Sequence, residues 1–540
     1  MRIICVVVLA ALTTSLSCAA WAQVTPFIID QARPDRAVTK PARAATPLAP
    51  LPAVAGPPKI APFVLNRVQI EGSSLPPAIL GAAAQPFVGR TVDTKVLGEI
   101  AAAVARAYAD RGNIALYTIA VPQQDFAGGT LRLSAIEGYI EHVDLSGDVS
   151  GRLELVTKYS NRLLQEHPLK RTTFQRYISL IRDIPGLSVD PKLLSGSAPG
   201  AVRLLLVLSP KTWHVALSAD DLGSNPLGRV QAQARASLYG LLREGEETSV
   251  TVSVPTQVRL FQYVALSESQ PLDDDGTALQ GTFGYLRTRP KSPSPSGTAK
   301  NLQFLITHPV LRSYDENFYL SGSVDGIDSS NATLGEIVAN ERIRALRLSG
   351  VYSLTSEKSA LGLSASLNSG LDVFGARTTD PALGDVGFKK LVAQASYNRL
   401  LGEEWVARLR ASAQLAFDRL PVSELYALGG DFGRAFPTAA AFGDSAIAGS
   451  AEIGFRPSWL PTLLKGSEIF GFADDGGTWY RSRSGFAPLD FHLASAGAGV
   501  GLPFHQETKL ELEAAHALIG DAPEMSAGGW RFIFALTTAY

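Results

Sequence analysis

The chain has 540 residues, a formal net charge of −1 and only 18% charged residues, while 46% of its residues are apolar. The near-neutral charge argues against a nucleic-acid partner, and the apolar fraction argues against a disordered chain. The length suits several domains, or one large barrel with accessory modules.

The first residues, MRIICVVVLAALTTSLSCAAWAQ, predict a secretory signal peptide over residues 1–22. Arg2 provides the positive start, an apolar run follows, and Ala20-Trp21-Ala22 forms a cleavage site. A membrane helix is the first alternative, but the run is too short. A lipoprotein signal at Cys18 is the second, but no leucine lies three residues before it. Both cysteines, Cys5 and Cys18, would leave with the signal, so the mature chain would contain no disulfide and no thiolate metal site.

A proline- and alanine-rich segment over residues 23–62 follows, and its composition predicts an extended linker. Within it, residues 25–40 are interrupted by Pro26 and Pro34, so any helix there would be short.

Residues 63–138 and 139–210 have the same predicted order of elements, in which a strand precedes helical sequence and a pair of strands closes the unit. The first unit has a predicted helix from the N-cap Thr91 to Gly112. Its predicted strands are 63–72, 114–121 and 130–136. The second unit has predicted helices at 153–165 and 173–183 and predicted strands at 139–145, 187–191 and 201–208. A repeated unit of this kind predicts an array of small α+β modules.

The helical pattern ends near Trp213, and residues 211–540 consist of runs in which polar and apolar side chains alternate. A soluble sandwich is one alternative, but it would need larger side chains on its inner face. At roughly 20 residues per strand and turn, this region gives about 16 strands, which fits an outer-membrane barrel. The predicted fold is therefore mainly β: a C-terminal transmembrane antiparallel β-barrel of about 16 strands, preceded by two small α+β modules.

The last residues, WRFIFALTTAY, place a row of aromatic and apolar side chains on every second position: Trp530, Phe532, Phe534, Leu536, Thr538 and Tyr540. We expect this row to face lipid and the membrane interface, with Arg531 on the opposite face. We also expect this strand to pair with the first strand, near Trp213, which would close the sheet and remove its edges.

No pattern of catalytic or metal-binding residues stands out. Gly443-Asp444-Ser445 is similar to the start of some lipase motifs, but it lies between barrel segments. The seven histidines are scattered, and the acidic run 273–275 has too few ligands for calcium, so we interpret it as a solvated turn. We therefore expect no enzyme activity, no cofactor and no metal.

Several motifs together resemble the two-partner-secretion transporters, the TpsB family of haemolysin and haemagglutinin exporters. FVLNRVQIEG and the segment ending in AIEG resemble its first POTRA module, and IRDIPGLSVDPKLL resembles its second. Asn113 stands where the family often has an aromatic residue. ALGGDFGRAF resembles the tip of the family's sixth extracellular loop, whose usual Val-Arg-Gly-Tyr is here Gly433-Arg434-Ala435-Phe436. Because alanine resists a positive φ, the backbone geometry expected at a glycine is in question at Ala435.

FGFADDGG contains Phe472-x-Asp474-x-Gly476, which matches the family's barrel-wall motif. Phe470, Phe472 and Asp474 fall on one face of this strand, and because a carboxylate facing lipid is costly, Asp474 should face the lumen. A buried carboxylate favours a cationic partner, and the resemblance implies that Arg434 is this partner. The expected contact between the loop and the wall is called the lock below.

The resemblance implies a transporter in the outer membrane of a Gram-negative bacterium, with its POTRA modules in the periplasm. Its expected partners are an unfolded exoprotein with an N-terminal secretion domain, the outer-membrane lipid, and the barrel-assembly machinery, which would recognise the last strand and its terminal Tyr540. The resemblance also implies a monomer. A plug helix, usual in the family, would have to fit into residues 25–40. The alternatives are an insertase of other barrels, which would have more modules, and a passive porin, which would have none.

Overall fold

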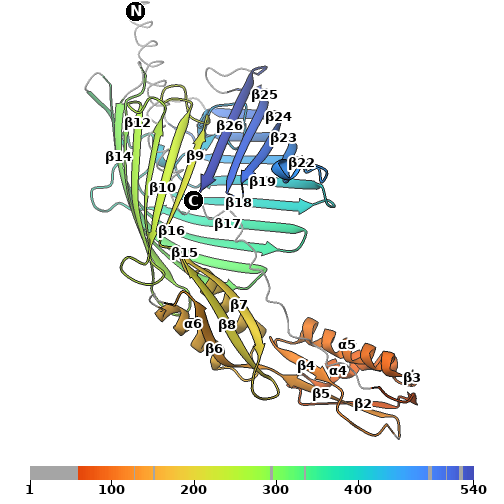
Figure 1. Cartoon of the computed structure of the whole chain (residues 1–540). Helices are drawn as coiled ribbons and strands as arrows, with labels where there is room; N and C mark the ends of the chain where they lie inside the picture. Colours follow the sequence, from red (N-terminus) through yellow and green to blue (C-terminus); the bar gives the residue numbers. More distant parts are fainter. Residues whose placement is uncertain are drawn as a thin grey trace, which may run out of the picture.

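The computed structural model describes residues 59–126, 128–149, 153–291, 296–333, 336–483, 489–505, 507–521 and 527–540 (Figure 1). The predicted signal peptide 1–22, the possible plug segment 25–40 and nearly all of the predicted linker 23–62 lie outside these residues. Figure 1 shows two small modules following one another away from one end of a large barrel.

The first module is a three-stranded sheet covered by two helices, with strand order β2-β5-β4. The side chains of α5 that face the sheet, such as Leu97 and Val104, are fully buried against Leu131 and Leu133. Its elements are β1 (Phe63–Val64), β2 (Arg67–Glu71), α4 (Pro77–Ala84), β3 (Thr91–Val92), α5 (Thr94–Arg111), β4 (Tyr117–Ala120) and β5 (Thr130–Glu137).

The predicted N-cap of the long helix was wrong. Thr91 belongs to β3, where it pairs with Val64 of β1, and the helix begins at Thr94. Asp93 is the true cap, since its carboxylate accepts a hydrogen bond from the Val96 amide at 2.8 Å. The sequence analysis also did not identify α4 as a separate helix.

The second module packs two amphipathic helices on a sheet of order β6-β8-β7, in which β6 and β8 run parallel. Its core joins Val156, Leu163 and Ile178 from the helices to Leu204 and Leu206 from the central strand. Its elements are β6 (Tyr139–Gly147), α6 (Glu154–Leu164), α7 (Arg171–Arg182), β7 (Leu187–Ser195) and β8 (Ala201–Pro210).

The two modules are joined at the start of α7. Arg171 donates hydrogen bonds to the carbonyls of Tyr108 and Gly112 at the end of α5, where a cation also complements the helix dipole. Asn113, the residue that departs from the family pattern, accepts a hydrogen bond from the Thr172 amide and so caps α7. These contacts fix one module against the other.

The rest of the chain forms a closed barrel of 16 strands, as predicted, and every neighbouring pair is antiparallel. The last strand pairs with the first, from Ala535–Asp220 to Ala539–Ala216. The barrel strands are β9 (Trp213–Asp220), β10 (Gln231–Tyr239), β11 (Glu247–Pro255), β12 (Phe261–Pro271), β13 (Ala278–Thr288), β14 (Ser296–Arg312), β15 (Glu316–Thr333), β16 (Glu336–Thr355), β17 (Ser359–Gly370), β18 (Lys389–Leu400), β19 (Trp405–Ala416), β22 (Ser445–Phe455), β23 (Glu468–Trp479), β24 (Asp490–His505), β25 (Thr508–Gly520) and β26 (Trp530–Ala539).

Alternation along the strands separates an apolar outer face from a polar inner face. In β26, Trp530 and Phe532 are largely exposed on the outer face and Phe534 is partly exposed, while Arg531 and Ile533 are buried on the inner face. Tyr540 follows the strand and is also exposed. Among the described helices, none is both long and apolar enough to cross a membrane.

The second module is docked on three turns at one end of the barrel, those between β10 and β11, β12 and β13, and β14 and β15. Glu244, in the turn between β10 and β11, accepts a hydrogen bond from the Leu155 amide at the start of α6 at 2.5 Å. In the turn between β12 and β13, the Asp274 carboxylate lies 3.0 Å from Arg162 of α6. The acidic run is a turn, as predicted, and Asp274 remains 43% exposed; its contact with the module was not predicted from the sequence.

The third turn makes the most enclosed of these contacts. Arg312, whose side chain is only 4% exposed, forms two parallel hydrogen bonds of 2.7 and 2.8 Å to the carboxylate of Asp183 at the end of α7.

Burial raises the pKa of the Glu244 carboxyl in the first turn above its usual value, although the amides of α6 oppose this shift.

Candidate functional site

The loop between β19 and β22, residues 417–444, folds back into the barrel as a hairpin; we call it loop six. It contains the short helix η2 (Val422–Glu424) and two short paired strands, β20 (Tyr426–Leu428) and β21 (Ala441–Gly443). Its tip residues Arg434 and Phe436 are buried, as is Leu428. The loop thus fills part of the lumen, and its side chains make two separate groups of charged contacts with the wall.

Arg434 contacts the wall formed by β22 to β25, where the lock was expected. Its Nε lies 3.5 Å from Asp474 Oδ2, and its backbone amide donates to the same oxygen at 3.3 Å. The guanidinium also lies 3.1 Å from Glu452 and 3.3 Å from Glu513. The structure therefore brings the two predicted residues together, and it adds two carboxylates that the sequence analysis did not identify.

The three residues of the wall motif on β23 contact loop six in different ways. The Phe472 ring lies under the Arg434 guanidinium, with 4.0 Å between the guanidinium carbon and the ring centre, in cation–π geometry. Asp474 has a fully buried side chain and provides the carboxylate. Gly476 provides space, because a Cβ at this position would lie 2.7 Å from Leu428 of the loop.

The tip keeps a regular backbone despite the alanine that replaces the family's glycine. Among the described residues, the non-glycine residues with positive φ are Phe374 and Ala439, so Ala435 is not in the left-handed region. The positive φ of 102° falls on Gly433 instead. The expected difficulty at Ala435 is therefore absent.

The tip is also tied to the seam where the barrel closes. Arg531 of β26 donates to the carbonyl of Phe436 and, at 2.9 Å, to the carbonyl of Asp221 just after β9. Thr438 donates to the carbonyl of Leu222 at 2.6 Å. The first strand, the last strand and the loop tip are thereby connected, and Arg531, which we predicted only to face inward, is the residue that joins them.

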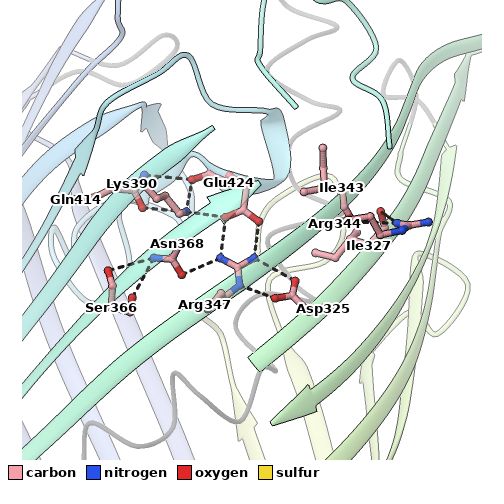
Figure 2. Close-up of polar contacts among 10 residues, drawn as sticks. All are labelled: Asp325, Ile327, Ile343, Arg344, Arg347, Ser366, Asn368, Lys390, Gln414 and Glu424. Atoms are coloured by element: carbon pink, nitrogen blue, oxygen red, sulfur yellow. Dashed lines mark hydrogen bonds and ion pairs between the residues drawn. The ribbon is translucent and has the colours of Figure 1, made fainter. Parts of the chain in front are cut away.

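The second group of contacts lies on a different part of the wall, formed by β15 to β18, and was not predicted from the sequence (Figure 2). Glu424, just before β20, forms two hydrogen bonds of 2.7 and 3.1 Å with Arg347 of β16. Lys390 of β18 lies 2.9 Å from the same carboxylate. Asp325 of β15 lies 2.6 Å from Arg347 and balances its charge. The alternation of β16 assigns Arg347 to the inner face, but nothing local in the sequence identifies its partner in loop six.

The Gly-Asp-Ser segment is structural. The Asp444 side chain is fully buried at the end of loop six, where it pairs with Arg483 at 2.6 Å and accepts a hydrogen bond from the Leu420 amide. Among the described residues, no cluster of three or more histidine, cysteine, aspartate or glutamate side chains could hold a metal ion.

The family comparisons agree with this architecture. The ShlB-type POTRA domain matches residues 63–138, and the family described as haemolysin secretion/activation protein ShlB/FhaC/HecB matches residues 205–503. A search of curated proteins found no match.

Solved structures show the same fold at low sequence identity. CdiB from Escherichia coli is 18% identical with a TM-score of 0.70, and the match covers 97% of this chain and 98% of that protein. CdiB from Acinetobacter baumannii is 15% identical with a TM-score of 0.64, covering 97% and 99%. BamA from Haemophilus ducreyi, lacking POTRA domains 1–3, is 14% identical with a TM-score of 0.53, covering 89% and 100%. Since the family match spans more than half of the residues, the chain belongs to the ShlB/FhaC/HecB family of haemolysin secretion/activation proteins.

Proposed function

We propose that this transporter exports one large, unfolded partner protein through its barrel, and that the two periplasmic modules bind the N-terminal secretion domain of that partner. Membership of the family makes the chain an outer-membrane two-partner secretion transporter with periplasmic POTRA modules. One observation favours passage through the lumen most. Loop six fills part of the lumen and is held there by side-chain contacts with the wall, which can break and re-form without unfolding the barrel.

Open sheet edges on the modules support the proposed binding of the partner. Among the described strands, β7 of the second module pairs only with β8, so its other edge has no partner strand there. In the first module, β2 is an edge strand of the same kind. An extended segment can add to such an edge through main-chain hydrogen bonds, which require little sequence specificity. This mode suits a partner that arrives unfolded.

The lock would hold the transporter closed between substrates. Passage requires the loop-six tip to leave the wall, which separates Arg434 from Asp474, Glu452 and Glu513. We propose that folding of the partner outside the cell gives the movement its direction. We further propose that the transporter works as a monomer surrounded by lipid, and that the barrel-assembly machinery recognises β26 with its exposed Phe532 and terminal Tyr540.

Deletion of Phe63–Leu208 tests the role of the modules. The variant should still reach the outer membrane as a barrel. Deletion of the whole gene identifies the partner as the protein that disappears from the culture medium, and the same protein should be absent from the medium with this variant. The proteins in the culture medium are compared by mass spectrometry. The amount of folded barrel in the outer membrane is measured in detergent gels, where a folded barrel changes its mobility on heating. Normal secretion by the truncated barrel would refute the proposed role of the modules.

An insertase of other barrels is the second candidate, because the fold is also similar to that of BamA. The two candidates differ in what is lost on deletion of the gene. An insertase would lower the levels of many outer-membrane barrels, whereas a transporter would remove one large protein from the medium and leave the other barrels unchanged.

A further inference from the structure

Two of the buried charges of loop six, opposite in sign, contact different parts of the barrel wall. Glu424 binds the wall formed by β15 to β18, and Arg434 binds the wall formed by β22 to β25. They lie ten positions apart along the loop, and they share no wall residue.

The Glu424 contact is short, and a further buried carboxylate of β16, Glu341, accepts a hydrogen bond from the neighbouring Val422 amide of the loop. Two cations, Arg347 and Lys390, face two carboxylates, Glu424 and Asp325, and each of these side chains is at most 6% exposed. The ion-pair distances from Arg347 and Lys390 to these carboxylates are 2.6 to 2.9 Å. Figure 2 shows the guanidinium of Arg347 held between Glu424 and Asp325, with Asn368 at its edge. Moving Glu424 away would leave Arg347 and Lys390 with one carboxylate less in a buried site, which is costly.

The backbone around Glu424 is fixed as well. Gln414 of β19 donates to the carbonyls of both Glu424 and Asp444 and so ties the two arms of the loop at its base. Leu420 and Leu425 flank Glu424 and pack into a buried apolar cluster with Ile343, Ala345, Phe388, Ala416 and Phe442.

The Arg434 contact is looser. A single guanidinium faces three carboxylates at 3.1 to 3.5 Å, and none of the three pairs has two parallel hydrogen bonds. When Arg434 leaves, Glu452 stays paired with Arg408 and Asp474 keeps the hydrogen bond from the Ser495 hydroxyl, so part of the carboxylate charge remains compensated.

We propose that loop six works as a lever: the Glu424 end is a fixed pivot, and the Arg434 end is a catch that releases. This inference rests on the transport function proposed above. It adds that Glu424, Arg347 and Lys390 are positioning residues, which hold the base of the loop in place while the tip swings away from β22–β25. The loop therefore does not leave the barrel as a whole.

Thiol labelling tests the lever directly, because the sequence has no cysteine after Cys18. Ser423→Cys reports on the pivot, and Ala435→Cys reports on the tip. Each is placed in the purified full-length protein, alone and combined with Arg434→Gln, and the rate of reaction with a small water-soluble thiosulfonate is measured. We expect Arg434→Gln to raise the rate several-fold at position 435 and to leave position 423 protected.

Three results would overturn the proposal: increased reactivity at both positions, at neither position, or at position 423 alone. Arg344→Gln is the matched control, because Arg344 lies on the same strand as Arg347 but pairs with Asp328 rather than with loop six. This control should change neither rate. The labelling needs no partner protein, so its failure is distinct from a failure of secretion.

Glu424→Gln provides the second measurement. A pivot variant should lower the temperature at which the barrel unfolds in detergent gels, and it should raise potassium chloride conductance in planar bilayers much less than Arg434→Gln does. Equal conductance of the two variants with an unchanged unfolding temperature would make Glu424 a second catch and overturn the lever.

Discussion

At the scale of single residues, the wall motif of β23 works because each of its inward positions has a different size and charge. Phe472 supports the guanidinium, Asp474 pairs with it, and Gly476 leaves room for Leu428. The ring of Phe472 itself needs space that a glycine of β24 provides, because a Cβ at Gly497 would lie 2.6 Å from the ring.

Gly476→Ala tests this account. The added methyl group would lie 2.7 Å from Leu428 and 3.0 Å from Ala448, so one of them must move. Overpacking of this kind typically costs about 1–3 kcal/mol of stability. We expect a lower unfolding temperature in detergent gels. Gly477→Ala is the control, since its added Cβ would lie 3.7 Å from the Phe491 carbonyl oxygen, an ordinary contact, and would face outward. An equal effect of both variants would contradict the account.

Glu244 gives a pH dependence at the docking surface. Burial raises the pKa of its carboxyl group in the folded protein. A carboxyl group whose pKa is higher in the folded than in the unfolded protein binds its proton more tightly when the protein is folded. Its contribution to stability is fully present below the unfolded-state pKa, about 4.3, and is lost as the pH rises through the folded-state pKa. Glu244→Gln cannot ionise and keeps one acceptor oxygen, which can serve the Leu155 amide, whereas the wild-type carboxylate accepts from both the Leu155 and the Val156 amides.

The variant should therefore protect the Leu155 amide from hydrogen exchange better than the wild type at neutral pH, and the two proteins should converge in acid. Exchange is compared at matched pH values. Glu154→Gln, which removes an exposed carboxylate of the same helix, should show no such pH-dependent difference. A wild type that is better protected at neutral pH would disprove the proposed cost of burying this charge.

At the scale of elements, loop six shows why the lock is more than one ion pair. Arg434 is shared by Asp474, Glu452 and Glu513, which come from three strands. Exchanging the charges of only one pair therefore changes the balance of the whole group.

We expect Arg434→Asp and Asp474→Arg each to impair secretion, and the double variant to recover only part of it. An aspartate at position 434 would still face Glu452 and Glu513. The measurement is the amount of partner protein in the medium, normalised to transporter in the outer membrane. Wild-type secretion by both single variants would refute the lock, and complete recovery by the double variant would show that Asp474 is its only important partner.

At the scale of the whole molecule, the docking surface fixes the second module relative to the barrel. Exposed pairs such as Arg162–Asp274 contribute little, on the order of 0–1 kcal/mol. Arg312, buried and bound to Asp183 through two parallel bonds, is the stronger contact.

Arg312→Ala should widen the distribution of distances between spin labels on the module and on the barrel, because it removes a paired and buried guanidinium. Arg342→Ala is the control, as its contact with Asp328 is 3.9 Å long and exposed on both sides. A distance distribution unchanged by Arg312→Ala would show that the remaining turns suffice to hold the module.

Patterns that repeat along the chain made most of the fold predictable. Alternation gave the barrel, and the outward row of β26 followed from the same rule. The first helix start was wrong because Thr91 and Asp93 are both good caps, and only the pairing of β3 with β1 decides between them. Glu424 was missed because its partners lie far away in sequence and come together only when the barrel closes.

The opposite charges at the two ends of loop six also have a consequence for biogenesis. A hairpin threaded into the lumen in the reverse sense would bring Glu424 towards Asp474, Glu452 and Glu513, and Arg434 towards Lys390 and Arg347. Both encounters are repulsive, and in a site with little water they are costly. The two charges therefore favour one orientation of the loop-six hairpin inside the barrel and disfavour the reverse one.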